Sequence, residues 1–338
     1  MQQSPFRNPQ FWIGILVSLA CLAAIFFFID PAQVAIALRT AQYGYLVLAA
    51  LALLVYLWLR ALRWRFMLGN AKISTLRVFH LQNIGFMMTQ LLPLRIGDPA
   101  RAVLVGSEDN LTIGQSISTM VVERVLDMLF VVALLPFTLI RVKVLPDWLR
   151  EGALFSGYLA LGVIVVVIVM ANFRPKVAHL ATTILDHIPF LDTQKTVTQI
   201  DNLLAGLVTL TSWRSGAQLV ILSILPWLLV VAAYQFAMRA VGLTPTLLGS
   251  AFVLCTSALS IAAPSSPGQV GVFHAAATFA VTALGFDQNA AASFALLYHA
   301  TNFTLVVLVG IVGLSQTQAT FGKVLAETRR FLGQRSDN

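Results

Sequence analysis

Charged residues are scarce in this chain. Asp, Glu, Lys and Arg make up 11% of its 338 residues, against roughly 25% in an average soluble domain. Apolar residues make up 58%, and no polar block of domain size interrupts them, which indicates a polytopic membrane protein. The net charge of +8 is carried mostly at the ends of apolar runs, where Lys and Arg set membrane topology, so nucleic acid is not an expected partner.

Other signals are also missing. The two cysteines, Cys21 and Cys255, lie inside apolar segments, so no disulfide framework or metal site is expected. The sequence has no Gly-rich phosphate loop, no His-Glu-x-x-His and no Gly-x-Ser-x-Gly. We therefore expect no cofactor and no enzymatic activity, and energy from nucleotide hydrolysis would have to come from elsewhere.

Six apolar runs are long enough to cross the hydrocarbon core of a bilayer as helices. They are Phe11–Ile29, Tyr43–Met67, Ser116–Ile140, Gly152–Asn172, Ala217–Ala240 and Ala290–Leu314. The first could instead be a cleaved signal peptide, but it is longer than most signal cores, and we expect a retained helix. The polar connection Phe173–Arg214 is expected to lie at the cytoplasmic interface.

Two further regions are interrupted by Pro and Gly. They are Thr75–Leu92 with the break Pro93–Pro99, and Thr246–Ala263 with the break Pro264–Gly268 and the run Val270–Leu284. Both breaks contain Pro-x-x-x-Gly, and Pro93 and Pro264 are 171 positions apart. Because hydrocarbon offers no water to the backbone groups that a break frees, paired breaks in two halves of a membrane protein indicate a substrate site.

The expected fold is an all-α polytopic membrane protein with about six full spans and two re-entrant half-helix hairpins, which would form an inverted repeat. Residues 1–320 would form the membrane domain and residues 321–338 a basic cytoplasmic tail that frays. A cytoplasmic amino terminus places 16 of the 22 Lys and Arg residues inside, so both termini are expected there. The first break would then open from the cytoplasm and the second from outside.

Polar residues surround the first break. Arg95 and Arg101 flank it, and their guanidinium groups could bind a phosphate beside freed backbone N–H groups. The alternative for Arg95 is a local bond to Asp98 or to backbone carbonyls. Asp98 itself stands at a helix start, where an aspartate is a good N-cap. Asn83, in the preceding half-helix, is expected to bond freed backbone groups across the hairpin.

Two arginines close the second span. Arg60 and Arg63 share a helical face beside Trp64. They would either contact anionic headgroups at the membrane interface or act only as topology signals.

Three ionisable residues, Glu123, Arg124 and Asp127, lie inside the third span. An ionisable residue at membrane depth is a functional candidate because its burial costs several kcal/mol. Arg124 is three positions from Asp127, so an ion pair within the helix is feasible. Alternatively, the cluster pins the third span to the first hairpin, and we expect a structural ion pair that borders the cavity.

The second break carries no charge. Ser265, Ser266 and Gly268 are small enough to allow close helix approach or to expose backbone to a ligand. His274 follows one turn later, and His299 lies in the last span. These histidines would relay protons or bind a headgroup, or else act as neutral hydrogen-bonding partners.

The motifs, taken in order, resemble a known family. They are Arg60-x-x-Arg63-Trp64, Asn83 before Pro93-x-Arg95-x-Gly97-Asp98-x-x-Arg101, Glu123-Arg124-x-x-Asp127, and Pro264-x-x-Pro267-Gly268-x-x-Gly271-x-Phe273. Over about residues 10 to 315 they are similar to the flippase-like transmembrane region of lysylphosphatidylglycerol synthases. The resemblance implies a bacterial or archaeal inner-membrane protein that binds a lipid and moves it across the bilayer.

The chain also departs from that family. We expect this protein to lack the aminoacyl-transferase domain that follows this region in the full synthase, so lysyl transfer is not expected. The family often has Glu where this chain has Asp98, Glu at the position of His274 and Arg near His299. Two histidines therefore replace a charge pair.

The expected function is that of a lipid transporter or flippase-like protein. Arg95 and Arg101 would hold an anionic headgroup, residues 265–268 would supply backbone donors, and the lipid would be an anionic phospholipid or a polyprenyl-phosphate-linked sugar. One alternative is a membrane-embedded headgroup-modifying enzyme, with Glu123, Asp98 or His274 as acid or base. Another is a scaffold for a lipid-synthesis enzyme, which would be a protein partner, as would a second copy of the chain.

Overall fold

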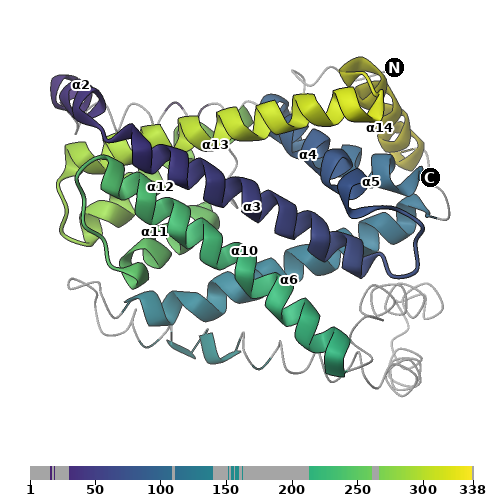
Figure 1. The fold of residues 1–338 in the computed structure, drawn as a ribbon, viewed down its shortest axis with the longest axis horizontal. Coiled ribbons are helices and arrows are strands. Elements are labelled where there is room, and N and C mark those ends of the chain that lie inside the picture. The colour runs from purple at the N-terminus through teal and green to yellow at the C-terminus, as the bar shows by residue number, and fades with distance from the viewer. Residues whose placement is uncertain are drawn as a thin grey trace.

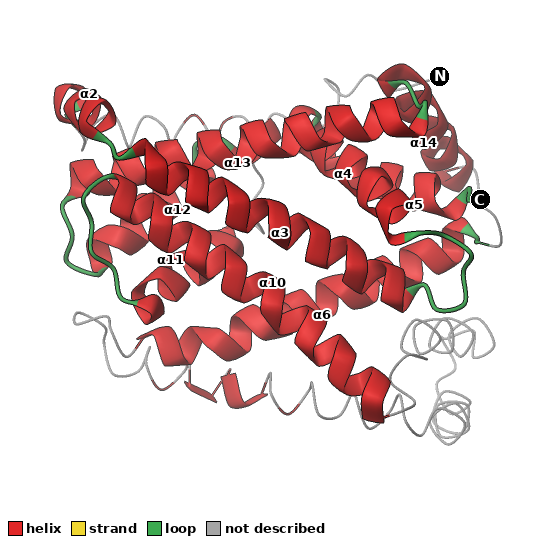
Figure 2. Cartoon of the chain, viewed as in Figure 1, coloured by secondary structure: helices red, strands yellow, loops and turns green. Residues whose placement is uncertain are grey.

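The computed structural model describes residues 30–108, 111–139, 213–260 and 266–336, and a few positions within 16–19 and 151–162. These residues form helices joined by loops (Figures 1 and 2). The all-α prediction is therefore confirmed for the part of the chain that the structure describes. The predicted spans Phe11–Ile29 and Gly152–Asn172 and the connection Phe173–Arg214 lie largely outside it.

Four long helices match predicted spans. They are α3 (Tyr43–Met67), α6 (Ile113–Leu139), α10 (Trp213–Ala240) and α13 (Gln288–Thr317). Among the described helices, α3, α10 and α13 are long and apolar enough to cross a membrane. The helix α6 is equally long but carries three ionisable residues. Large aliphatic side chains such as Leu51 of α3 and Leu308 of α13 are more than half exposed, as a lipid-facing surface requires. The chain is a helical membrane protein.

Each half of the chain has one broken hairpin between two long helices. The first consists of α4 (Thr75–Leu91), the 3-10 turn η2 (Pro93–Arg95) and α5 (Gly97–Gly106). The second consists of α11 (Leu247–Ser260), the 3-10 turn η4 (Pro267–Gln269) and α12 (Val272–Ala283). The order of long helix, hairpin and long helix therefore occurs twice.

The two halves run in opposite directions. The start of α3 meets the end of α10, where the Gln42 N–H donates to the Ala240 carbonyl at 2.8 Å. The helix α2 (Pro31–Thr40) packs on the start of α13, and the Asp30 N–H donates to the Asn289 side chain at 3.1 Å. The first hairpin enters from the end of the molecule where α14 (Phe321–Ser336) lies, and the second enters from the end where α2 lies (Figure 1).

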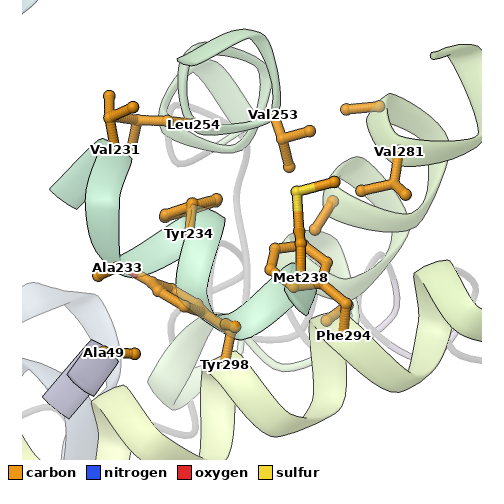
Figure 3. Packing of buried hydrophobic residues seen from close by; sticks show 14 of the residues in the cluster. Ala49, Val231, Ala233, Tyr234, Met238, Val253, Leu254, Val281, Phe294 and Tyr298 are labelled. Carbon is orange, nitrogen blue, oxygen red and sulfur yellow. The ribbon is translucent and has the colours of Figure 1, made fainter. Parts of the chain in front are cut away.

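The largest apolar core lies between α3, α10 and the second hairpin with α13. Tyr234 and Met238 of α10 point toward Val253 of α11 and toward Phe294 and Tyr298 of α13 (Figure 3). The rings of Tyr234 and Tyr298 are 4.2 Å apart between centroids. This packing fixes the second hairpin against α10 and α13.

Glycines allow the first hairpin to close tightly. A side chain on Gly97 of α5 would meet the carbonyl oxygen of Gly85 in α4 at 1.9 Å. On the opposite side of α4, a side chain on Gly310 of α13 would meet Cβ of Met87 at 2.4 Å. The helix α4 is therefore held between α5 and α13 by close contacts that only glycine allows.

The carboxyl-terminal segment corrects an expectation. Residues after Gly322 were expected to fray, but Phe321–Ser336 forms the helix α14, which packs against α5. Val324 and Thr328, one turn apart, are its buried contacts, while Arg329 and Arg330 are exposed. Because the buried face of α14 is so narrow, the sequence of this segment resembles that of a solvated tail.

Gly97→Ala should destabilise the fold by about 1–3 kcal/mol, because its methyl group meets backbone that cannot move aside. Gly44→Ala is the matched control, since nothing lies within 4 Å of the added atom at that helical position. Unfolding of the two purified variants would be compared with that of the wild type. Equal stability of both variants would contradict the close helix contact.

Candidate functional site

The two breaks have the same backbone conformation. Each is a 3-10 turn that begins with Pro and continues with two residues in the left-handed region. In the first, Leu94 and Arg95 have φ of 59° and 52°, and in the second, Gly268 and Gln269 have φ of 70° and 60°. A non-glycine residue with positive φ is strained, and such strain is found most often at functional sites.

This geometry corrects the register of the repeat. The sequence pattern aligned Pro93 with Pro264 and Gly97 with Gly268. In the structure, Pro93 occupies the position of Pro267, 174 residues further along, because each begins its 3-10 turn. Gly97 then corresponds to Gly271. Gly97 is the first residue of α5, and Gly271 directly precedes α12. Pro264 and Ser265 lie outside the described residues.

The tips of the two hairpins meet. The turn η4 contacts η2 and the end of α4. A side chain on Gly268 would come within 3.4 Å of the Gln90 carbonyl oxygen and 3.6 Å of the Phe303 ring. The interrupted backbone of each half therefore lies against the other half, as the prediction of two paired breaks requires.

Polar groups gather around this meeting point. Arg95 is exposed at the first tip. Ser266, which opens the second tip, donates its hydroxyl to the Val270 carbonyl at 3.2 Å. Gln90 and Gln269 complete the polar surroundings, and sequence reasoning missed both. The corrected register supplies the signal for Gln269, because Gln269 occupies the position in the second repeat that Arg95 occupies in the first.

Asp98 does not cap a helix. The helix α5 begins at Gly97 after Ile96, whose side chain forms no cap hydrogen bond. Asp98 lies in the first turn and accepts a hydrogen bond from Arg124 Nη2 at 2.8 Å. Of the two alternatives for Arg124, the ion pair with Asp127 within α6 is therefore not the one that the structure has. Arg124 links α6 to the first hairpin instead, as the pinning alternative predicts.

Glu123 is the centre of a buried ion cluster. Its carboxylate, which has no exposed surface, accepts from Arg60 and Arg63 of α3 and from Arg101 of α5. The Arg63 contact measures 3.1 Å and the Arg101 contact 2.5 Å. Asp127, one turn further along α6, accepts from Arg63 at 2.8 Å and from Arg60 at 3.5 Å. The cluster joins three helices, and its formal charge is +1.

Aromatic rings enclose the cationic side of this cluster. The Arg101 guanidinium lies 4.4 Å from the Trp64 ring centroid and 5.2 Å from that of Phe86. Arg60 lies 4.9 Å from Phe86 and donates to the Tyr56 hydroxyl at 2.9 Å. Cation–π contact of this kind stabilises a buried guanidinium.

Arg60, Arg63 and Arg101 do not make the contacts that the sequence suggested. Their side chains are at most 10% exposed and are bound to carboxylates, so they neither lie at a headgroup interface nor flank the break openly. A buried arginine needs a carboxylate partner, and these arginines find theirs in α6. Of the two arginines expected to hold a headgroup, only Arg95 is exposed.

Asn83 also differs from its expected role. Its side-chain N–H donates to the Phe79 carbonyl at 2.7 Å within α4 and does not reach across the hairpin. It is fully buried where α4 packs on α13. The helix continues past Asn83 to Leu91, so no freed backbone group lies beside it.

The two histidines come together. His274 of α12 and His299 of α13 stack with their ring centroids 4.7 Å apart. The Gly271 N–H donates to His274 Nδ1 at 3.2 Å. The prediction of neutral hydrogen-bonding partners fits His274, while the contact between the two rings was not expected from the sequence.

The fold and the site together define the class of membrane protein to which this chain belongs. This is a helical membrane protein in which two oppositely directed broken hairpins meet at their tips beside a buried ion cluster. Comparison with known proteins is more specific. The family model described as "Lysylphosphatidylglycerol synthase TM region" matches residues 11–310, and the chain belongs to this family.

A curated relative and the solved structures extend this comparison. The chain is similar to a "UPF0104 membrane protein" of Methanothermobacter thermautotrophicus (strain Delta H), with 22% identity over 94% of this chain and 95% of the relative. No solved structure matches the chain. The expected family membership is confirmed, and the protein is a multi-pass membrane protein.

Glu123→Gln should destabilise the protein by about 3–5 kcal/mol, because it leaves the buried Arg101 without a carboxylate partner among the described residues and leaves Arg60 and Arg63 with Asp127 alone. Glu108→Gln is the matched control. It alters the more exposed pair with Arg77 and should cost less than about 1 kcal/mol. Denaturant unfolding of the purified variants measures both, and similar losses would contradict a dominant role for the cluster.

Proposed function

We propose that the protein moves an anionic lipid across the cytoplasmic membrane, with the headgroup held where the two hairpin tips meet. The observation that carries this proposal is the meeting of two broken helices, each with a 3-10 turn that contains two residues in the left-handed region, beside Phe303 near the middle of α13. Broken backbone survives in a membrane only where protein or a wet site satisfies it, and such half-helix ends commonly bind substrate.

The hairpins would be re-entrant and related as an inverted repeat. Their antiparallel directions support this arrangement, since one would then reach the midplane from each side of the membrane. With both termini in the cytoplasm, the first hairpin opens inward and the second outward. A site that each side can approach through a different hairpin suits alternating access.

Arg95 is the proposed headgroup contact. It is the exposed arginine at the tips, and a guanidinium binds a phosphate through two parallel hydrogen bonds. Gln90, Ser266 and Gln269 offer neutral donors and acceptors around it. The acyl or prenyl chains would stay in the bilayer beside the apolar outer faces of the long helices. Both anionic phospholipids and polyprenyl-phosphate-linked lipids carry the phosphate that this site would recognise.

The ion cluster would hold the first hairpin in place during movement. Glu123 is fully buried under three arginines and Asp98 is bound to Arg124, so neither carboxylate stands open to a reacting headgroup. This arrangement supports transport over headgroup chemistry. Protein partners such as a second copy or a lipid-synthesis enzyme are compatible with the proposal but are not needed for it.

Arg95→Ala should slow the transbilayer movement of a fluorescent anionic phospholipid in proteoliposomes by about tenfold to a hundredfold, because a charge-assisted bond of about 1.5–3 kcal/mol is lost and each 1.4 kcal/mol is about one factor of ten. Arg39→Ala, at an exposed arginine of α2, is the control and should leave the rate unchanged. If the wild-type protein moves no anionic lipid, the proposal is wrong and the alternative of a scaffold for a lipid-synthesis enzyme is favoured. Equal rates for both variants would remove Arg95 from the site.

A further inference from the structure

A pair of stacked imidazoles, His274 of α12 and His299 of α13, lies next to the second break. The rings of His274 and His299 are 17° from parallel at 4.7 Å. Phe273 packs edge-on against both, with centroid distances of 5.8 and 5.4 Å, and the Phe303 ring lies 6.3 Å from His299. The surroundings of the pair are therefore aromatic, and a charge placed there would lose most of its hydration.

The pair is tied to the backbone of the break. His274 Nδ1 accepts the N–H of Gly271, the residue with φ of 89° that precedes α12 and follows η4 by two positions. An imidazole nitrogen that accepts a hydrogen bond carries no proton, so His274 in this conformation is the neutral tautomer with its proton on Nε2. Phe303, which contacts the histidine pair, also lies 3.6 Å from the side-chain position of Gly268 in η4.

No carboxylate partner is available to a protonated ring in the described structure. The other titratable group of α13 near the pair is Tyr298, whose ring stacks on Phe273 at 5.8 Å. The segments α11, η4 and α12 contain no charged residue. The charged residue of α4 is Arg77, which pairs with Glu108 at the far end of that helix. A positive charge on the pair would thus be unneutralised.

We propose that His274 and His299 form a proton-binding site and that a proton bound there loosens the second hairpin from the first. A proton on His274 Nδ1 removes the acceptor of the Gly271 N–H, and a second positive charge on the stacked rings repels the first. Protonation therefore disfavours the conformation described here, which is held at high pH and released as the pH falls. This inference rests on the proposed function, and it predicts that the rate of lipid movement depends on pH.

The test measures the accessibility of the second tip. A cysteine is placed by Ser266→Cys in a chain that also carries Cys21→Ser and Cys255→Ser, reconstituted in vesicles. Its labelling rate by a maleimide is divided by that of Asn70→Cys, an exposed loop position, to remove the ordinary pH dependence of the thiol. Between about pH 8 and about pH 5.5 the ratio should rise by about threefold or more.

Variants of the histidines show where the proton binds. In the double variant His274→Gln and His299→Gln the ratio should stay flat, because an amide can accept the Gly271 N–H but does not titrate. His274→Asn with His299→Gln repeats the test if that protein does not fold. His80→Gln, at a histidine of α4 outside the pair, is the control and should keep the rise.

A flat ratio in the wild type, or a rise that persists in the double variant, overturns the proton site. Lipid movement is recorded over the same pH range in vesicles that hold the chain with Ser266 intact, which separates the two proposals. Lipid that moves at a rate independent of pH overturns the coupling and leaves transport standing. A rise in labelling without any lipid movement overturns transport and leaves the proton site standing.

Discussion

A helix that is broken inside hydrocarbon must find partners for the backbone groups that the break frees, and this constraint shapes the whole molecule. The described residues contain two such breaks, and each lies against the opposite hairpin. The strained backbone of Leu94 and Arg95 persists because glycine contacts on both sides of α4 hold the first hairpin closed. Movement of the second tip against the first would therefore break the contacts between them, which is the mechanical basis of the proposed transport.

The two halves use the same scaffold but different chemistry. In the corrected register, Asp98 and Arg101 of the first hairpin correspond to Val272 and Ala275 of the second. The first hairpin is fixed by charges to α6 and, through Glu123, to α3, whereas the second is fixed by aromatic and aliphatic packing and contributes His274 to the histidine pair. Such asymmetry suits a device in which one hairpin stays anchored while the other responds.

Hydropathy alone predicted α3 to the residue and placed α6, α10 and α13 within a few residues, because long apolar runs leave few alternatives to a helix. Pro and Gly likewise located both breaks. The partners of the charges could not be predicted: Arg124 has Asp127 three positions away, yet it reaches Asp98 in another helix. Local spacing offers a feasible pair, and only the tertiary packing decides which carboxylate lies nearer. The stacking of His274 on His299 depends in the same way on how α12 meets α13.

The central claim is that an anionic lipid binds where the tips meet, and native mass spectrometry of lipids retained by the purified protein tests it without assuming which lipid is bound. The wild type should retain one anionic lipid class selectively, and Arg95→Ala should lose that class while keeping its fold. Retention of the same bulk lipids by both proteins would contradict the claim.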